Sequence, residues 1–501
     1  MRTKNALKTF IYGIFFTIII AILGLIKTKV LLKCLGDEYV GIYQLFYQIY
    51  LYLSIVDGGV GASVTYRLYK PVSENDANSI NKIMEASRRY FNKIGIIVTI
   101  LGFLLSFEIM FFIKETSVET IYIKSCFVLY VISSAISYFT ISHAFLYESE
   151  QKLYKSSNLN HVLTIAESIC AIIIAYMGGK LLTILISFVL LSICKNIILL
   201  SISKKDHKYL KKVEEIDDSF KKDANNLIIK KISTLVFENS GVMIISKFLG
   251  LTSVIVYNAY NQIITMLKLI IQRLNSALLP SVGNLLVSEN KKAKNIFEET
   301  NSLSYFISNS LFAPLFFMLN PFISLWYGDK YVSSRLICLL FVVNLYLQII
   351  KIPLDAFINA AGKFKEIRKC SIYESVGCVF LSILLVKKYG ISGILLSTMI
   401  SMFFGDLIIY AKIVCKKIVY IKISDYIKKV IKYLIGLAIN VITVFFIGMW
   451  INVNSLIMWL VKGIILFLIS VLVNFTYFYI TKELLFFDRL RKIIKVKIAK
   501  K

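Results

Sequence analysis

Residues 33–49, KCLGDEYVGIYQLFYQI, and residues 247–263, KFLGLTSVIVYNAYNQI, are two versions of one pattern. They share seven identities in seventeen positions at a constant offset of 214 residues. Leu35-Gly36 pairs with Leu249-Gly250, and Gln48-Ile49 pairs with Gln262-Ile263. Each copy lies between one long apolar run and the next. A repeat of this kind predicts a chain built from two related halves.

The composition identifies the environment of these halves. Of the 501 residues, 57% are hydrophobic, whereas about 45–50% is usual for a soluble protein. A helix needs about 20 apolar residues to cross a bilayer, and the chain has enough runs of that length for an all-α polytopic membrane protein. Fourteen helices are predicted, over residues 10–29, 39–65, 93–113, 122–145, 158–177, 181–202, 226–246, 251–279, 303–326, 332–361, 371–386, 391–411, 431–450 and 455–479. The run at 371–386 is the least secure, because it is short and contains Glu374.

The charge distribution predicts the orientation. The chain has 58 Lys and Arg against 30 Asp and Glu, a formal charge of +28, which in a soluble protein would favour nucleic acid as a partner. About 40 of the basic residues fall in segments on the same side of the membrane as the N-terminus, and about 11 fall in the turns on the opposite side. Basic residues concentrate on the cytoplasmic side of a membrane. We therefore expect a bacterial cytoplasmic (inner) membrane protein with both termini in the cytoplasm, basic loops against anionic lipids and no nucleic-acid partner.

The repeat also predicts the domain organisation. Six helices separate the two copies, so both halves face the same way and their symmetry axis runs along the membrane normal. We expect an N-terminal six-helix lobe over residues 1–215 and a C-terminal six-helix lobe over residues 216–415. Residues 416–501 would form helices 13 and 14 and a basic cytoplasmic tail. The first apolar run has no small-residue cleavage site, so it is interpreted as an uncleaved helix.

Several kinds of chemistry have no support in the sequence. The eight cysteines contain no C-x-x-C pair, so neither a disulfide framework nor a zinc site is indicated. The three histidines are dispersed, and no Walker A motif is present. We predict no catalytic residues, no metal and no bound cofactor, and therefore no enzyme activity.

Ionisable residues inside the spans are the main functional signal. Each costs about 2.5–3.5 kcal/mol at the centre of a bilayer unless it faces protein or water. Cations collect in or beside the spans that would line the space between the lobes. They are Lys27, Lys29, Arg67, Lys230, Lys231, Lys268, Arg273 and Lys351. Lys and Arg bind phosphate, so we predict an anionic substrate.

Two polar stripes complete the predicted binding site. Within residues 251–279, Asn258, Asn261, Gln262, Lys268 and Gln272 recur at helical spacing, which predicts a hydrated cavity; a hydrogen-bonded seam between helices is the alternative. Within residues 39–65, Tyr43, Tyr47 and Tyr50 share one face, which suits a sugar. Here the alternative is an aromatic seam.

Acidic residues at membrane depth are candidates for coupling transport to Na⁺ or H⁺. We name Asp57 and Glu238, because a shielded carboxylate can exchange a proton near neutral pH. Lys351 and Asp355 have i, i+4 spacing and are expected to neutralise each other. The sequence identifies no partner for the charges at Glu167, Lys195, Asp406 and Lys462. Three glycines in residues 57–61 are expected to break the second helix.

Several of these segments carry a resemblance. Residues 35–43 (LGDEYVGIY), 53–61 (LSIVDGGVG), 68–71 (LYKP), 257–261 (YNAYN) and 279–284 (LPSVGN) resemble the bacterial polysaccharide or O-antigen repeat-unit flippases (Wzx-like) of the multidrug/oligosaccharidyl-lipid/polysaccharide exporter superfamily. The resemblance implies two pseudo-symmetric six-helix lobes, as in the MATE transporters, plus two extra C-terminal helices. It also implies transfer of an undecaprenyl-pyrophosphate-linked oligosaccharide of capsule, O-antigen or teichoic-acid type between leaflets by alternating access.

The resemblance identifies a family better than a substrate, and three alternatives stay open. A lipid II flippase differs only in cargo, and an ion-coupled drug exporter of the same superfamily would resemble proteins of twelve helices. The third alternative is a scaffold that transports nothing. Lipid-linked oligosaccharide, membrane lipids and the polysaccharide polymerase machinery are the expected partners.

Overall fold

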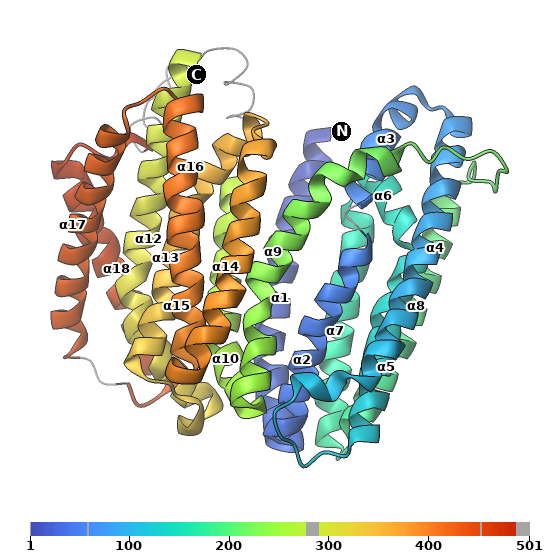
Figure 1. Ribbon diagram of the computed structural model, residues 1–501, viewed down its shortest axis with the longest axis horizontal. Helices are drawn as coiled ribbons and strands as arrows, with labels where there is room; N and C mark the ends of the chain where they lie inside the picture. Colours follow the sequence, from blue (N-terminus) through green and yellow to red (C-terminus); the bar gives the residue numbers. More distant parts are fainter. Residues whose placement is uncertain (1, 58–59, 277–289, 451–452, 487–501) are drawn as a thin grey trace. The chain divides into compact units, whose positions relative to one another are not determined.

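The computed structural model describes residues 2–57, 60–276, 290–450 and 453–486, and within these ranges every regular element is a helix (Figure 1). The first half comprises α1 (Arg2–Leu35), α2 (Asp37–Leu53), η1 (Ser54–Asp57), α3 (Val60–Glu74), α4 (Ala77–Phe107), η2 (Ile109–Phe112), α5 (Thr120–Ala135), η3 (Ile136–Phe139), α6 (Ile141–Ser149), α7 (Tyr154–Tyr176), α8 (Leu181–Asp206) and α9 (Phe220–Leu249). The second half comprises α10 (Leu251–Ser276), α12 (Asn290–Tyr327), η4 (Asp329–Tyr331), α13 (Arg335–Ala360), α14 (Phe364–Tyr389), α15 (Ile391–Ser401), η5 (Met402–Leu407), α16 (Ile408–Ile413), η6 (Val414–Ile418), α17 (Ile423–Gly448) and α18 (Leu456–Ile480).

The predicted membrane spans are confirmed with one difference. Within the described ranges, thirteen helices are long and apolar enough to cross a membrane, and they match thirteen of the fourteen predicted runs. The exception is the run at 39–65, which is divided into α2, the 3₁₀ turn η1 and α3. The break falls beside Asp57 and the glycines that follow it, as predicted. The uncertain run at 371–386 belongs to α14, a continuous helix of 26 residues.

The two copies of the repeated pattern form the same turn. Gly36, between α1 and α2, has φ 87° and ψ 174°, and Gly250, between α9 and α10, has φ 92° and ψ 174°. Side chains with a Cβ rarely adopt a positive φ of this kind. Glycine at both positions therefore has a backbone reason, and the predicted repeat has a structural counterpart at this point.

Close contacts divide the chain into two units, Met1–Ile255 and Val256–Lys501. In the first unit α1 packs along α7, α5 packs against both α4 and α8, and α9 packs against α2 and α3. In the second unit α12 packs against α13, α17 and α18, while α14 packs against α15. The contacts of α9 place it in the first unit, although the sequence analysis puts residues 216–415 in the second lobe. The predicted lobe limits at 215 and 415 stay predictions.

The last two long helices are attached to α12 by buried polar side chains. Asn440 of α17 donates to the carbonyl of Ser470 at 2.8 Å, and Ser470 of α18 donates to the carbonyl of Ser310 at 2.8 Å. Asn474 adds a hydrogen bond to the hydroxyl of Ser310 at 3.1 Å. Small and amide side chains hold membrane helices together in this way, so α17 and α18 are fixed parts of the second unit.

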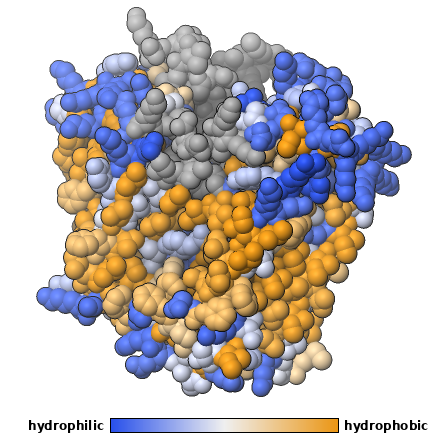
Figure 2. All heavy atoms as spheres, turned by 45° about the vertical axis from the view of Figure 1, so that its right-hand side comes forward, coloured by the Kyte–Doolittle hydropathy of each residue, from blue (hydrophilic) through white to orange (hydrophobic). Residues whose placement is uncertain are grey.

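The surface agrees with a membrane environment. Figure 2 shows apolar side chains gathered in a broad zone between two zones of hydrophilic residues. On α4 the exposed apolar residues include Ile96, Ile100, Phe103 and Leu104, each about half exposed or more. In water so large an apolar surface would drive association. This is a multi-pass membrane protein, and lipid covers that zone.

Candidate functional site

Tyrosines of α2 meet around one buried tyrosine of α5. The ring centroids of Tyr43 and Tyr50 lie 5.9 Å and 6.2 Å from that of Tyr130, both in edge-on geometry. Tyr130 is buried, whereas Tyr47, on the same side of α2, keeps 49% of its surface exposed. The sequence analysis leaves open a sugar-binding face or an aromatic seam. Tyr43 and Tyr50 take part in such a seam, and Tyr47 presents an open ring.

Three charges from three helices lie beside this tyrosine cluster. Lys27 of α1 donates to the hydroxyl of Tyr43 at 3.3 Å, and its ammonium lies 5.2 Å from the centroid of that ring. Glu167 of α7 interacts electrostatically with Lys27 and with Lys195 of α8. All three side chains lie within membrane spans. The first unit therefore contains, at membrane depth, two cations and one anion next to tyrosine hydroxyls.

These three charges do not form a tight salt bridge. Among the described residues no ammonium nitrogen lies within 4.0 Å of the Glu167 carboxylate, and Lys195 instead donates to Asn160 at 3.3 Å. Lys195 is only 9% exposed. Glu167 and Lys195 lie on different helices, so no spacing in the sequence links them to each other or to Lys27.

The other predicted residues of the first unit lie around this cluster. Asp57, the last residue of η1, interacts electrostatically with Tyr50, and Glu238 of α9 interacts with Tyr47. Arg67 of α3 interacts with Asp217, in the segment before α9. Lys29 is exposed on α1. The side chains of Lys230 and Lys231 lie outside the described part of the chain.

In the second unit the polar stripe of α10 is only partly covered. Asn258, Asn261, Gln262 and Lys268 are half-buried and Gln272 is exposed, while Ala259, Tyr260, Ile264 and Ile271 are buried. The side chain of Gln262 accepts a hydrogen bond from Tyr327 at 3.4 Å. The helix is thus amphipathic, as predicted. The side chain of Arg273 is outside the described residues.

Lys351 has a different main partner from the one predicted. Its ammonium forms a short ion pair with Asp406, which is fully buried, and lies 3.9 Å from the carboxylate of Asp355. It also lies 5.2 Å from the centroid of the Tyr410 ring. The charge of Lys351 is therefore neutralised mainly by Asp406, and not by Asp355 alone as expected. Asp406 is 55 residues away along the chain, so helical spacing could not indicate this pair.

The ion pair sits on an irregular helix. Residues 402–407 and 414–418 are π-helical turns in the helix that runs from α15 to α16. π-helical turns are rare in proteins, and those that occur are often found at functional sites. Asp406 lies in the first of them, and its Oδ1 is buried without a hydrogen-bond partner among the described residues. The second unit thus holds a closed, buried ion pair.

The comparisons assign the chain to a family. The model of the polysaccharide biosynthesis protein family matches residues 6–286, more than half of the chain. The chain belongs to the polysaccharide biosynthesis protein family. No curated protein sequence matches it significantly.

Solved structures show the fold of this family member. A lipid II flippase, MurJ, in an inward closed conformation has a TM-score of 0.72 with 17% identity over 94% of this chain and 98% of its own. An inward-facing MATE multidrug transporter of the MOP superfamily has a TM-score of 0.62 with 13% identity over 79% and 94%. A MOP superfamily transporter from Pyrococcus furiosus has a TM-score of 0.61 with 13% identity over 83% and 96%. The predicted resemblance and fold class are confirmed: the architecture is that of the MurJ and MATE transporters.

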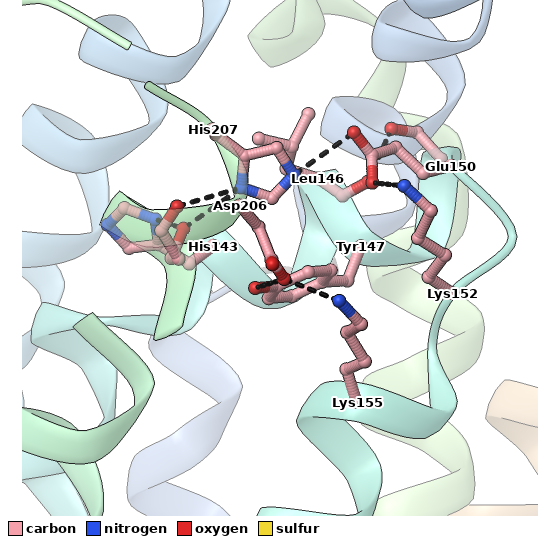
Figure 3. A network of polar contacts seen from close by, with 10 residues as sticks. His143, Leu146, Tyr147, Glu150, Lys152, Lys155, Asp206 and His207 are labelled. Atoms are coloured by element: carbon pink, nitrogen blue, oxygen red, sulfur yellow. Dashed lines mark hydrogen bonds and ion pairs between the residues drawn. The ribbon is translucent and has the colours of Figure 1, made fainter. Parts of the chain in front are cut away.

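A second polar cluster of this family member lies where α6 and α8 end (Figure 3). The carboxylate of Glu150 accepts hydrogen bonds from His207 at 3.0 Å and from Lys152 at 3.0 Å. Asp206 accepts from Tyr147 at 2.8 Å and from Lys155 at 2.6 Å. Here every carboxylate has two donors, so the start of the segment between α8 and α9 is firmly attached to α6 and α7. We call these residues the α6–α8 clamp.

Candidate metal ligands are dispersed in the described part of the family member. No group of three or more His, Cys, Asp or Glu residues is arranged to hold a metal ion there, and the eight cysteines are free. The solved structures that share this fold include a lipid II flippase and a MATE transporter. What the site offers is positive charge and tyrosine hydroxyls at membrane depth.

Proposed function

We propose that this protein is a flippase that moves an undecaprenyl-pyrophosphate-linked oligosaccharide repeat unit from the cytoplasmic to the outer leaflet. The cargo is of capsule, O-antigen or teichoic-acid type, and alternating access is the mechanism. The protein acts in the bacterial cytoplasmic membrane with both termini in the cytoplasm, and it carries out no chemical conversion and needs no bound cofactor.

The observation that supports this proposal most directly is the set Lys27, Glu167 and Lys195. Within this set two cations stand against one anion, so one positive charge remains in a low-dielectric region whenever Asp57 and Glu238, which act on the neighbouring tyrosines, are protonated. That charge favours an anionic group such as a pyrophosphate. The ammonium of Lys27 is already held by a tyrosine hydroxyl, so phosphate and sugar contacts would lie side by side. A transporter for cationic drugs needs the opposite charge balance.

Exchange of Lys27 tests this assignment. We expect Lys27→Gln to lower export of repeat units at least tenfold, with lipid-linked units accumulating on the cytoplasmic side. The matched control is Lys33→Gln on the same helix, whose side chain is exposed and whose loss should change export less than twofold. Surface polysaccharide and the accumulated lipid intermediate are measured in a deletion strain that expresses each variant. Equal export by wild type and Lys27→Gln would contradict the proposal.

Coupling to Na⁺ or H⁺ is part of the proposal, through Asp57 and Glu238. Both carboxylates interact electrostatically with tyrosines of α2, so a change in their charge would alter the same cluster that holds Lys27. Asp57→Asn and Glu238→Gln should uncouple export from the ion gradient. Export that keeps its dependence on the gradient in the double variant would place coupling elsewhere.

A lipid II flippase is the second candidate. The similarity in fold to MurJ extends over 94% of this chain and favours this second candidate. The similarity to the MATE transporter extends over only 79% of this chain. Depletion distinguishes the two cargoes: loss of peptidoglycan synthesis with accumulation of lipid II indicates the second, and loss of surface polysaccharide alone indicates the first. Membrane lipids and the polymerase machinery are the partners that the first cargo requires.

A further inference from the structure

The second unit has a small cavity at the first turns of α12 and α17. Its volume is about 190 Å³, less than the ~300 Å³ at which pockets for drug-sized ligands begin. It is distinct from the polar stripe of α10 and from the Lys351 ion pair, none of whose residues line it. Its size suits a small headgroup rather than an oligosaccharide.

Two helix faces with the same spacing form its walls. Lys294, Phe297, Glu298 and Asn301 of α12 follow one another at positions i, i+3, i+4 and i+7. Residues 422, 425, 426 and 429, at the start of α17, repeat this spacing. Side chains at such positions lie on one face of a helix. The chain therefore presents two four-residue faces to one space.

Apolar and ionic contacts define the shape of the cavity. The rings of Phe297 and Tyr426 lie 6.1 Å apart between centroids and provide an aromatic wall. The ammonium of Lys429 lies 2.8 Å from the carboxylate of Glu298, so this pair joins the two helices and neutralises itself. The positive charge left for a ligand comes from Lys294 and Lys422.

These two lysines are available. Both are exposed side chains of the lining, and neither forms an ion pair with any described residue. Asp425, also in the lining, is exposed and can accept a hydrogen bond. Phosphate oxygens are common guests of lysine ammonium groups, whereas Asp425 needs a donor such as a hydroxyl.

Asn301 supplies the second, independent indication of a ligand. It lines the cavity and is only 2% exposed, and its Oδ1 is buried without a hydrogen-bond partner in the described chain. Buried polar atoms nearly always have partners, so an unsatisfied one calls for an explanation. A hydroxyl that enters the cavity would satisfy this acceptor, and a bare apolar chain would not.

We propose that this cavity binds a polyol phosphate, that is, a phosphoester that carries free hydroxyl groups. Lys294 and Lys422 hold the phosphate, Asn301 and Asp425 accept hydrogen bonds from the hydroxyl groups, and Phe297 and Tyr426 pack against the carbon skeleton. A phosphatidylglycerol headgroup of the inner leaflet and a soluble glycerol phosphate share this chemistry. Basic pockets at the cytoplasmic ends of membrane helices bind anionic headgroups. This site shares no residue with the cargo site, and only its assignment to the inner leaflet rests on the orientation in the proposed function.

The test is ligand-dependent thermal stability of the full-length protein. A ligand that binds only the folded state raises the melting temperature. The protein is measured in phosphatidylcholine nanodiscs alone, with phosphatidylglycerol, and with phosphatidylserine as an anionic lipid without a polyol. Further samples contain glycerol 3-phosphate or inorganic phosphate in solution. We expect a rise of several degrees with phosphatidylglycerol or glycerol 3-phosphate and less than half of that rise with the other two anions.

Two sets of variants keep the result interpretable. Asn301→Leu removes the unsatisfied acceptor, so the unliganded variant should melt no lower than wild type and should lose most of the ligand-induced rise. Lys294→Gln with Lys422→Gln should lose the rise as well, whereas Lys428→Gln, exposed on α17 outside the cavity lining, should keep it. A rise with glycerol 3-phosphate alone identifies the soluble source, and a rise with the lipid alone identifies the membrane source. Equal rises with all four anions, or a full rise in Asn301→Leu, would overturn the proposal.

Discussion

The first and second units bury charge in opposite ways. In the first unit Glu167 interacts electrostatically with Lys27 and Lys195 without direct contact between opposite charges, and Lys27 donates to a tyrosine hydroxyl. In the second unit Lys351 and the fully buried Asp406 are in direct contact. Charges that are not in contact with an opposite charge can still attract a ligand, whereas two opposite charges in direct contact largely cancel each other's electric field. The comparison indicates a binding role for the first set and a structural or switching role for the second.

The largest expected effect is on the closed pair. Lys351→Met leaves the Asp406 carboxylate buried without its cation, which costs about 3–5 kcal/mol for a buried ion pair. We expect a large loss of folded protein, measured by thermal unfolding and by gel filtration of the solubilised protein. The double variant Lys351→Met with Asp406→Leu removes both charges and should recover most of the loss. A single variant as stable as the double would show that the pair is not closed in the membrane.

The sequence predicts the fold of both units well and their charge partners poorly. Hydropathy places the helices, because each span must satisfy its own backbone and face lipid. The glycine turns at Gly36 and Gly250 and the break beside Asp57 are local features, and the sequence shows them. Asp406 pairs with Lys351 from 55 residues away, and no period or motif connects such positions. Only the packed structure distinguishes an isolated buried charge from a paired one.

Substitutions in the set Lys27, Glu167 and Lys195 should change ligand binding more than protein stability. Glu167→Gln removes the anion that offsets Lys27 and Lys195, so inorganic pyrophosphate should bind the purified protein about tenfold more tightly, which corresponds to about 1.4 kcal/mol. Lys195→Met should weaken binding by a similar factor. Titration calorimetry measures both, and the loss of stability should stay near 1 kcal/mol because no contact pair is broken. Changes of the same sign in the two variants would contradict an electrostatic origin.

Only some of the contacts in the candidate site follow from local sequence patterns. Tyr43 and Tyr50 are found together because they share a helix face, a property that periodicity reveals. Glu167 and Lys195 were recognised only as ionisable residues in apolar runs. Their meeting with Lys27 depends on how α1, α7 and α8 pack, which the sequence does not encode in any local pattern.

The smallest expected effect is in the α6–α8 clamp, where water reaches the charges. Burial raises the pKa of Glu150, but hydrogen bonds from His207 and Lys152 outweigh it and hold the pKa below its usual value of 4.5. A carboxyl whose folded pKa is lowered stabilises the fold above its unfolded pKa and loses that contribution as the pH falls through the folded value. Wild type should therefore lose about 1 kcal/mol as the pH falls from 6 to 3 that Glu150→Gln does not lose, measured as the difference between their melting curves. Glu214→Gln, an exposed acid in the same connecting segment, is the control and should follow wild type. If Glu150→Gln showed the same pH dependence as wild type, the charge of Glu150 would not contribute to the stability of the clamp.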